Sequence, residues 1–177
     1  RAQDMYAWVN VTLDAGRAAG APATGLFFDK LRGDGTIDHT LWTYNQGSMI
    51  GANVLLARQA ARGDDAGAGE PYLARAEAIA AKALRHYAGT YVDQPAAFNA
   101  ILFRNLLQLR AATADAALRE QISGAMSAYA EAAWIAHRDR HDRFRFTRRG
   151  PTLLDQSAMV QVYALLAWDP ADYGALA

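Results

Sequence analysis

The chain has 177 residues and equal numbers of basic and acidic side chains, 18 of each, so its formal net charge is zero. A neutral chain has no overall field that would draw it to nucleic acid or to an anionic membrane. The absence of cysteine excludes disulfides, thiol nucleophiles and thiolate metal sites. Alanine dominates while Val and Ile are scarce, which predicts an all-helical protein with enough apolar residues for a core.

The N-terminal part is expected to form one helix followed by a long loop. Residues 3–19 carry an apolar stripe at helical spacing, made of Met5, Trp8, Val9, Thr12 and Leu13. Gly20 and Pro22 end this pattern, and residues 21–42 read as a loop in which 26–28 fit a short strand. Because the helical pattern begins almost at Arg1, without a leader, we expect an internal piece of a longer chain, which leaves its cellular location open.

Five more helices follow along the chain. They are expected from Thr43 onward and over residues 71–88, 95–112, 115–136 and 152–168. The first, third and last of these are apolar on most sides, and we expect the last to be deeply buried. The helices at 3–19, 71–88 and 115–136 are amphipathic instead. This alternation predicts three helical hairpins in two layers, with the whole of 1–177 as a single partial domain.

The helix that begins at Thr43 has an unusual start, because residues 42–57, WTYNQGSMIGANVLLA, pass from polar and aromatic to apolar. Thr43 and Gln46 have the spacing of a capping box, in which each side chain satisfies a backbone N–H at the helix start. The polar residues would alternatively converge on a ligand. Gly47 and Gly51, four residues apart, share a face and would allow another helix to approach closely.

This stretch resembles the signature helix of glycoside hydrolase family 76, the bacterial and fungal endo-α-1,6-mannanases, in which IGA follows TYNQG. Three further segments resemble family motifs in the same order, namely TGLFFD (24–29), RGDD with PYLARAEAIA (62–80) and FNAILFRNLLQL (98–109). The last of these keeps the family's Phe98, Ile101, Arg104, Asn105 and Leu106, although Asn99 stands where the family often has Lys. A weaker match lies at 155–158, DQSA.

The resemblance implies an (α/α)6 barrel of about twelve helices, of which these six would form the C-terminal half. Substrate in such barrels lies at one mouth, where the inner helices begin. The implied substrate-binding residues are Trp42, Thr43, Tyr44, Asn45, Gln46 and Arg104. Aromatic rings would stack on sugar faces, and the amides would bond to hydroxyls. For Arg104, an ion pair with Asp155 or Asp29 is an equal alternative.

The resemblance also implies hydrolysis of α-1,6-linked mannose by two adjacent aspartates, a nucleophile and an acid/base, without metal or organic cofactor. In the family this pair precedes the TYNQG helix. Asp64-Asp65 follows it in a Gly-rich loop, so we assign no catalytic residue in this chain and expect the pair upstream of Arg1. The segment alone would be inactive. Its expected partners are an α-mannan oligosaccharide and a missing N-terminal half or second copy, and the family's location would be secreted or cell-envelope.

Two other functions stay open from the residues. One is a catalytically inactive helical scaffold, or a carbohydrate- or protein-binding domain, of the same architecture. The other is phosphate or nucleic-acid binding through residues 138–149, which contain six arginines and two phenylalanines. Because Asp139 and Asp142 offset part of that charge, we expect local ion pairs and no nucleic-acid partner. His137 and His141 have a metal-compatible spacing, but neighbouring arginines repel cations, so we expect no metal site.

Overall fold

A computed structural model describes residues 1–18, 25–62, 67–147 and 150–176. The α-helices, in chain order, are α1 (Ala2–Thr12), α2 (Ala15–Ala18), α3 (Thr43–Ala60), α4 (Glu70–His86), α5 (Ala96–Ala112), α6 (Ala116–His137) and α7 (Leu153–Ala167). Two 3-10 helices, η1 (Tyr91–Asp93) and η2 (Pro170–Leu176), and a hairpin of β1 (Lys30–Leu31) and β2 (Ile37–Asp38) complete these parts. The prediction of an all-α protein is confirmed.

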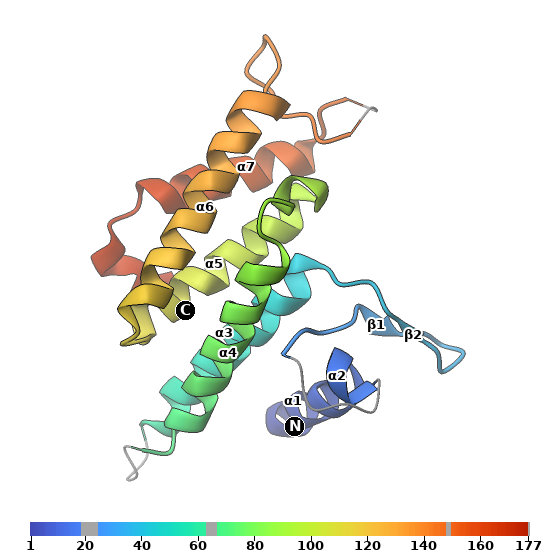
Figure 1. Ribbon diagram of the computed structural model, residues 1–177, viewed down its shortest axis with the longest axis vertical. Helices are drawn as coiled ribbons and strands as arrows, with labels where there is room; N and C mark the ends of the chain where they lie inside the picture. Colours follow the sequence, from blue (N-terminus) through green and yellow to red (C-terminus); the bar gives the residue numbers. More distant parts are fainter. Residues whose placement is uncertain (19–24, 63–66, 148–149, 177) are drawn as a thin grey trace.

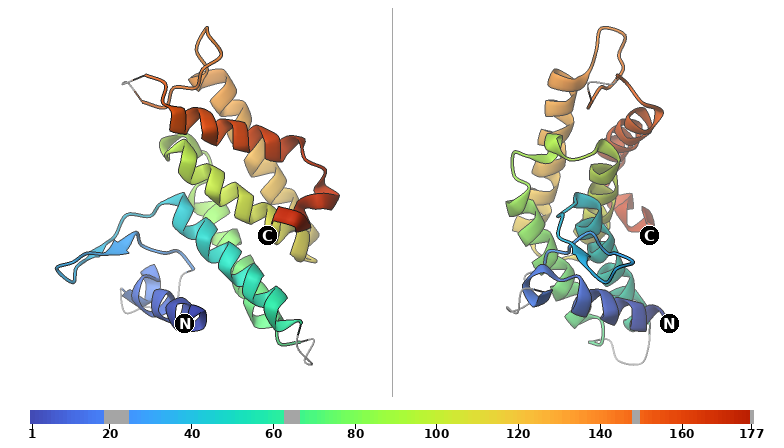
Figure 2. Two further views of the ribbon diagram at one scale, coloured as in Figure 1. Left: turned by 180° about the vertical axis from the view of Figure 1, so that it is seen from behind. Right: turned by 90° about the vertical axis from the view of Figure 1, so that its right-hand side faces the viewer.

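The five long helices form two layers. Helices α3, α5 and α7 lie side by side with α5 in the middle, and α4 and α6 pack on one face of this row, in front of it in Figure 1 and behind it in the left view of Figure 2. The chain alternates between the layers, so that α3 with α4, and α5 with α6, make helical hairpins. The predicted alternation of inner and outer helices therefore holds from α3 to α7. This arrangement places the N-terminal ends of α3 and α5 close together.

Two glycines allow α3 to lie directly against α5. A methyl group added at Gly47 would lie 2.6 Å from the Cα of Leu102, and one added at Gly51 would overlap the side chain of Asn105. A larger side chain at Gly47 would push the backbone of α5 away, and one at Gly51 would displace the side chain of Asn105. The close approach predicted from the spacing of the two glycines is confirmed.

The outer layer packs on the inner one through the predicted apolar stripes. On α4, the buried positions include Ala76, Ile79 and Ala83, as expected from their helical spacing. On α6, Ile122 and Met126 are buried in the same way. A helix with one apolar face buries that face by packing on one side only, and α4 and α6 pack in this way in the outer layer.

The first helix is shorter than the sequence predicts. Instead of one helix over 3–19, α1 ends at Thr12 and the short α2 begins at Ala15. Asp14, which lies between them, is fully buried and accepts hydrogen bonds from the backbone N–H of Gly16 (3.0 Å) and Arg17 (3.3 Å). It also forms a 2.8 Å ion pair with Arg75 of α4. A carboxylate buried in this way needs such partners, and meeting them interrupts the helix.

Apolar side chains on α1, α5 and α7 are more exposed than predicted. Met5 and Trp8, expected in a buried stripe of α1, are 70% and 48% exposed. On α7, expected to be buried on most sides, Leu154 and Val160 are 64% and 69% exposed, and Ile101 of α5 is also exposed. A helix that is apolar all round is buried only when it has neighbours all round. The described part of the chain covers the inner layer on one face only.

The strand expected at 26–28 is also not formed. Phe27 makes a single bridge to Asp14, and the hairpin forms just afterwards, with Lys30 opposite Asp38. Its turn is closed by Asp34, whose carboxylate accepts bonds from the backbone and hydroxyl of Thr36. Throughout the described ranges, no helix is long and apolar enough to cross a membrane.

Candidate functional site

Three aromatic rings meet at the N-terminal ends of α3 and α5. Phe98, in the first turn of α5, lies 4.6 Å from the ring of Tyr44 and 5.4 Å from the ring of Trp42, measured between centroids. All three side chains are half-buried, so each keeps part of its surface open. Phe98 therefore links α5 to the polar start of α3.

Asp29 joins this aromatic group from the loop before β1. The hydroxyl of Tyr44 donates a 2.5 Å hydrogen bond to Asp29 Oδ1, and Lys30 Nζ lies 3.2 Å from Asp29 Oδ2. The Asp29 side chain is only 9% exposed. Burial by itself raises the pKa of Asp29, but the bonds from Tyr44 and Lys30 outweigh it and hold that pKa below its ordinary value. Burial and the adjacent carboxylate raise the pKa of Tyr44, which therefore stays protonated as a donor.

Asn45 adds an unused hydrogen-bond donor beside these residues. Its Nδ2 atom is buried and makes no hydrogen bond of good geometry among the described residues, although the side chain is near enough to Asp29 to help lower the pKa of that carboxyl. A buried amide nitrogen without a partner is unfavourable until something binds it. We call Asp29, Lys30, Trp42, Tyr44, Asn45 and Phe98 the Tyr44 cluster.

Gln46 and Thr43 do not belong to the open part of this cluster, because both are fully buried. The Gln46 side chain accepts a 2.8 Å bond from the backbone N–H of Phe27 and donates 3.0 Å bonds to the carbonyls of Phe27 and Trp42. The predicted capping box is therefore wrong. Trp42 precedes the helix without a side-chain cap, Thr43 is already helical, and its hydroxyl has no partner among the described residues. Gln46 instead fixes the loop that carries Asp29.

Arg104 lies apart from the cluster. It follows Phe98 by six residues on α5, which is about 9 Å along a helix axis. Its guanidinium donates a 3.0 Å bond to the carbonyl of Leu176 in η2. The ion pair with Asp155 or Asp29, which was the alternative to a substrate contact, is not formed, since Asp155 bonds to Thr152 at the start of α7 and Asp29 to Tyr44.

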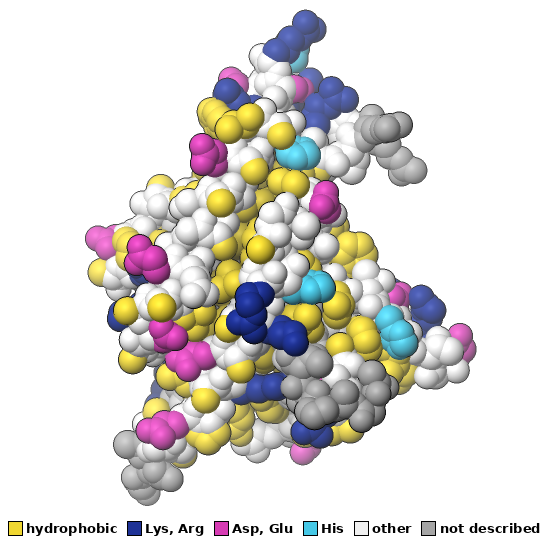
Figure 3. Space-filling model, in the orientation of Figure 1, with side chains coloured by type: hydrophobic (Ala, Val, Ile, Leu, Met, Phe, Trp, Pro, Cys, Tyr) yellow, Lys and Arg dark blue, Asp and Glu magenta, His cyan; other side chains and the backbone are white. Residues whose placement is uncertain are grey.

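The other candidates from the sequence lie elsewhere. Asp64-Asp65 falls outside the described residues. In the loop between α6 and α7, at the upper end of Figure 3, Arg138 pairs with Asp142 and Arg143 with Asp139, as expected for local ion pairs. Among the described residues no group of three or more His, Asp or Glu side chains could hold a metal ion.

Sequence reasoning missed Asp29 and Lys30 as members of the site. Asp29 was visible as the last residue of the TGLFFD segment, and the polar start of the TYNQ segment is the signal that could have linked the two. The sequence does not reveal the path of residues 25–42, and this path brings Asp29 into contact with Tyr44. The finished cluster combines flat aromatic surface, one ionised carboxylate and a buried amide donor that makes no hydrogen bond of good geometry, which is the chemistry that binds hydroxylated rings.

Comparisons with known proteins identify the family and the fold. Residues 1–167 match the sequence model of glycosyl hydrolase family 76. A search of curated proteins gave no match. Among solved structures, the chain is similar to the α-1,6-mannanase of Salegentibacter sp. HEL1_6, with 23% identity and a TM-score of 0.64.

Two inactive variants of that enzyme, each with two adjacent aspartates replaced, are also similar in structure. One is bound to α-1,6-mannotetrose (21% identity, TM-score 0.65) and the other to α-1,6-mannotriose (23%, 0.65). Each match covers 93% of this chain but 51% of the solved chain. The chain therefore spans about half the length of the solved structures it resembles, and at this identity the likeness shows the fold.

Proposed function

Because the chain belongs to glycosyl hydrolase family 76, we propose that it is the C-terminal half of a glycoside hydrolase domain that cleaves α-1,6-linked mannose. The described helices include two hairpins, α3 with α4 and α5 with α6, followed by α7, and this alternation of inner and outer helices supports half of an (α/α)6 barrel. The observation that carries the proposal is the position of the Tyr44 cluster. It lies where two inner helices begin, which is the end of such a barrel that receives substrate.

In this proposal the Tyr44 cluster forms one wall of the glycan cleft. Trp42, Tyr44 and Phe98 present partly open rings on which the apolar face of a mannose unit stacks. Asn45 donates an amide hydrogen to a sugar hydroxyl, and Asp29 accepts a hydrogen bond from another. Gln46 and Thr43 support this wall from behind, and Arg104 takes no part at this end of α5.

Catalysis is assigned to residues that this chain does not supply. The cluster contains one carboxylate, whereas glycoside hydrolysis of this kind uses two, one as acid and one as nucleophile or base. We therefore propose that the adjacent aspartates belong to the other half of the domain and that this segment alone does not hydrolyse mannan. In this proposal the present half contributes to glycan binding, and the other half supplies the residues that cleave the glycan.

The exposed apolar residues of the inner layer indicate that another protein surface covers them. Leu55 of α3, Ile101 of α5, and Leu154 and Val160 of α7 are large apolar side chains of the inner layer that are exposed to solvent. We propose that an N-terminal half of the domain covers them, and that a second copy of the chain takes its place when the half is missing. Light scattering of the isolated 177-residue chain should give a dimer or larger assembly. A monomer that melts cooperatively would count against this.

The cleft is tested by binding in the intact domain. Replacing Tyr44 and Asn45 together by alanine should weaken the binding of α-1,6-mannotetrose about 10- to 100-fold, measured by calorimetry, since a stacking contact and a hydrogen bond are lost. Gln59→Ala, an exposed change at the far end of α3, should leave the affinity unchanged. Unchanged binding in the double variant would show that the cluster does not contact the glycan.

The same preparation separates an enzyme from a non-catalytic scaffold. Chromatography of α-1,6-mannotetrose after incubation with the intact domain should reveal shorter oligosaccharides. Tight binding with no shorter product would favour the carbohydrate-binding scaffold over the hydrolase.

A further inference from the structure

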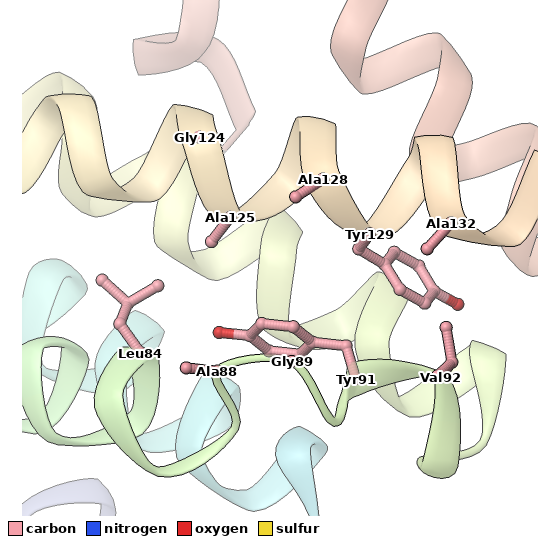
Figure 4. Close-up of a pocket in the computed structure, with 10 residues that line it drawn as sticks. All are labelled: Leu84, Ala88, Gly89, Tyr91, Val92, Gly124, Ala125, Ala128, Tyr129 and Ala132. Atoms are coloured by element: carbon pink, nitrogen blue, oxygen red, sulfur yellow. The ribbon is translucent and has the colours of Figure 1, made fainter.

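The outer layer contains a pocket that the Tyr44 cluster does not use. It lies between α4 and α6, beside η1, and has a volume of about 270 Å³ (Figure 4). Figure 3 shows the same side of the molecule, where hydrophobic side chains line the strip between these two helices. The pocket belongs to the opposite layer from α3, α5 and α7, so it is separate from the proposed glycan cleft.

The pocket exists because small residues face one another across the two helices. On α6 the lining residues are Gly124, Ala125, Ala128 and Ala132, and from the α4 side they include Ala88 and Gly89. No atom lies within 4 Å of a methyl group added at Gly89 or at Gly124. Leu84, Val92 and the rings of Tyr91 and Tyr129 complete an almost wholly apolar wall.

One polar atom in this wall has no partner. Tyr91 is 6% exposed, and its hydroxyl oxygen is buried and makes no hydrogen bond to any described residue. In Figure 4 the ring lies across the pocket with its hydroxyl directed toward Ala88 and Leu84. Burial raises the pKa of this phenol, so it is a neutral group that can both donate and accept. An unsatisfied hydroxyl beside an apolar space is a costly arrangement that a suitable ligand would relieve.

We propose that this pocket binds a small apolar molecule that carries one oxygen, such as a ring or short alkyl chain bearing a hydroxyl or carbonyl group. The apolar part fills the space between the alanines of α6 and the end of α4. The oxygen bonds to the hydroxyl of Tyr91. The volume suits a ligand of fragment size and is too small for an oligosaccharide.

The proposal is tested with a matched pair of probes, benzyl alcohol and ethylbenzene, which have nearly the same shape but differ by a hydroxyl in place of a methyl group. Their binding to the intact protein is followed by NMR titration. Both should bind with dissociation constants of about 1 mM, as expected for ligands of this size. Shifts should centre on the amides of Gly89 and Gly124.

Two variants separate filling of the pocket from the hydrogen bond. Ala128→Phe places a ring in the space and should abolish binding of both probes, whereas Ser127→Phe, on the neighbouring exposed position of α6, should not. Tyr91→Phe should keep ethylbenzene binding but shift the affinity ratio about fivefold against benzyl alcohol, the loss of one ordinary hydrogen bond.

Three results would overturn the proposal. Neither probe shifting any amide that lines the pocket would show that the space is not a site. Equal loss of binding in Ser127→Phe and Ala128→Phe would place the site elsewhere or make it non-specific. An unchanged affinity ratio in Tyr91→Phe would show that the Tyr91 hydroxyl does not bond to the ligand. None of these outcomes depends on mannan binding or cleavage, so they are distinguishable from a failure of the proposed function.

Discussion

Gln46 and Gln156 hold the same place in two different inner helices. Each is the fourth residue of its helix, α3 or α7, and each uses its side-chain amide to bond both backbone groups of an earlier phenylalanine. Gln46 bonds Phe27 at 2.8 and 3.0 Å, and Gln156 bonds Phe144 at 2.9 and 2.8 Å. Each also donates to the carbonyl of the residue just before its helix.

The middle inner helix has a shorter version of this contact. Asn99 is the fourth residue of α5, and its Nδ2 donates a 2.7 Å bond to the carbonyl of Tyr91. An asparagine side chain is one methylene shorter and reaches only one backbone group. All three inner helices therefore tie down an aromatic residue of the preceding segment by an amide in the first turn. The stretches of chain between these helix starts differ in length, so the three amides do not recur at one fixed spacing in the sequence.

These contacts make unequal contributions to stability, because their burial differs. Gln46 is fully buried, so Gln46→Ala should lower the free energy of unfolding by about 2–4 kcal/mol, since Phe27 is left with unsatisfied buried backbone groups. Gln156 is half-buried, and Gln156→Ala should cost about 1–2 kcal/mol because water reaches part of the gap. Urea unfolding followed by circular dichroism measures both.

Gln121→Ala on the exposed side of α6 is the matched control and should change stability by less than about 0.5 kcal/mol. Equal losses at positions 46 and 121 would mean that the buried amide does not hold the loop.

The fold was largely predictable, because the spacing of apolar residues along a helix reveals which of its faces packs against the rest of the protein. The stripe of α4 with Ile79, and that of α6 with Ile122, lie where the spacing placed them. The errors come from properties that periodicity does not contain. The break after Thr12 follows from the pairing of Asp14 with Arg75, which are distant in the sequence. The exposure of α7 follows from how many neighbours that helix has, which its own residues do not reveal.

The site was predictable in part, and the reason is similar. Tyr44 and Asn45 were predicted because polar residues at the start of an apolar helix are a local signal, and the structure places both in the Tyr44 cluster. The role of Gln46 was mistaken, because a local capping box and a bond to Phe27 require the same residue type. Asp29 contacts Tyr44 only through the fold of the intervening loop, so no short-range pattern could assign it.

The contact between α3 and α5 gives a second prediction. Gly47→Ala should destabilise the protein by about 1–3 kcal/mol or more, because the added methyl group meets backbone atoms of α5 that no rotamer change can move. Gly124→Ala is the matched control, also inside a helix but with no atom within 4 Å of the new methyl group. That change should stabilise the protein by about 0.5–1 kcal/mol, since glycine is a poor helix former.

Thermal unfolding of the two variants should therefore move in opposite directions. A Gly47→Ala protein that unfolds at the wild-type temperature would show that α3 and α5 do not pack through their backbones at this point.

The hydrogen bond from Tyr44 to Asp29 leads to a prediction on pH dependence. The pKa of Asp29 in the folded chain lies below its ordinary value of 3.8. A carboxyl whose pKa is lowered by folding binds fewer protons in the folded state. Its contribution to stability is therefore complete above about pH 4 and disappears as the pH falls through the folded pKa. The Tyr44 cluster should stay intact at neutral and weakly acidic pH.

Tyr44→Phe removes the donor but keeps the ring and its burial. The pKa of Asp29 should then rise, because burial still opposes the charged form and only Lys30 and Asn45 remain to favour it. Carboxyl NMR titration of wild type and variant measures the change. Asp139 is an internal control in the same spectra, since bonds from Arg143 and His141 outweigh its desolvation, lower its pKa to about 2 and do not involve Tyr44. A titration of Asp29 that is the same in both proteins would mean that Tyr44 does not hold this carboxylate in solution.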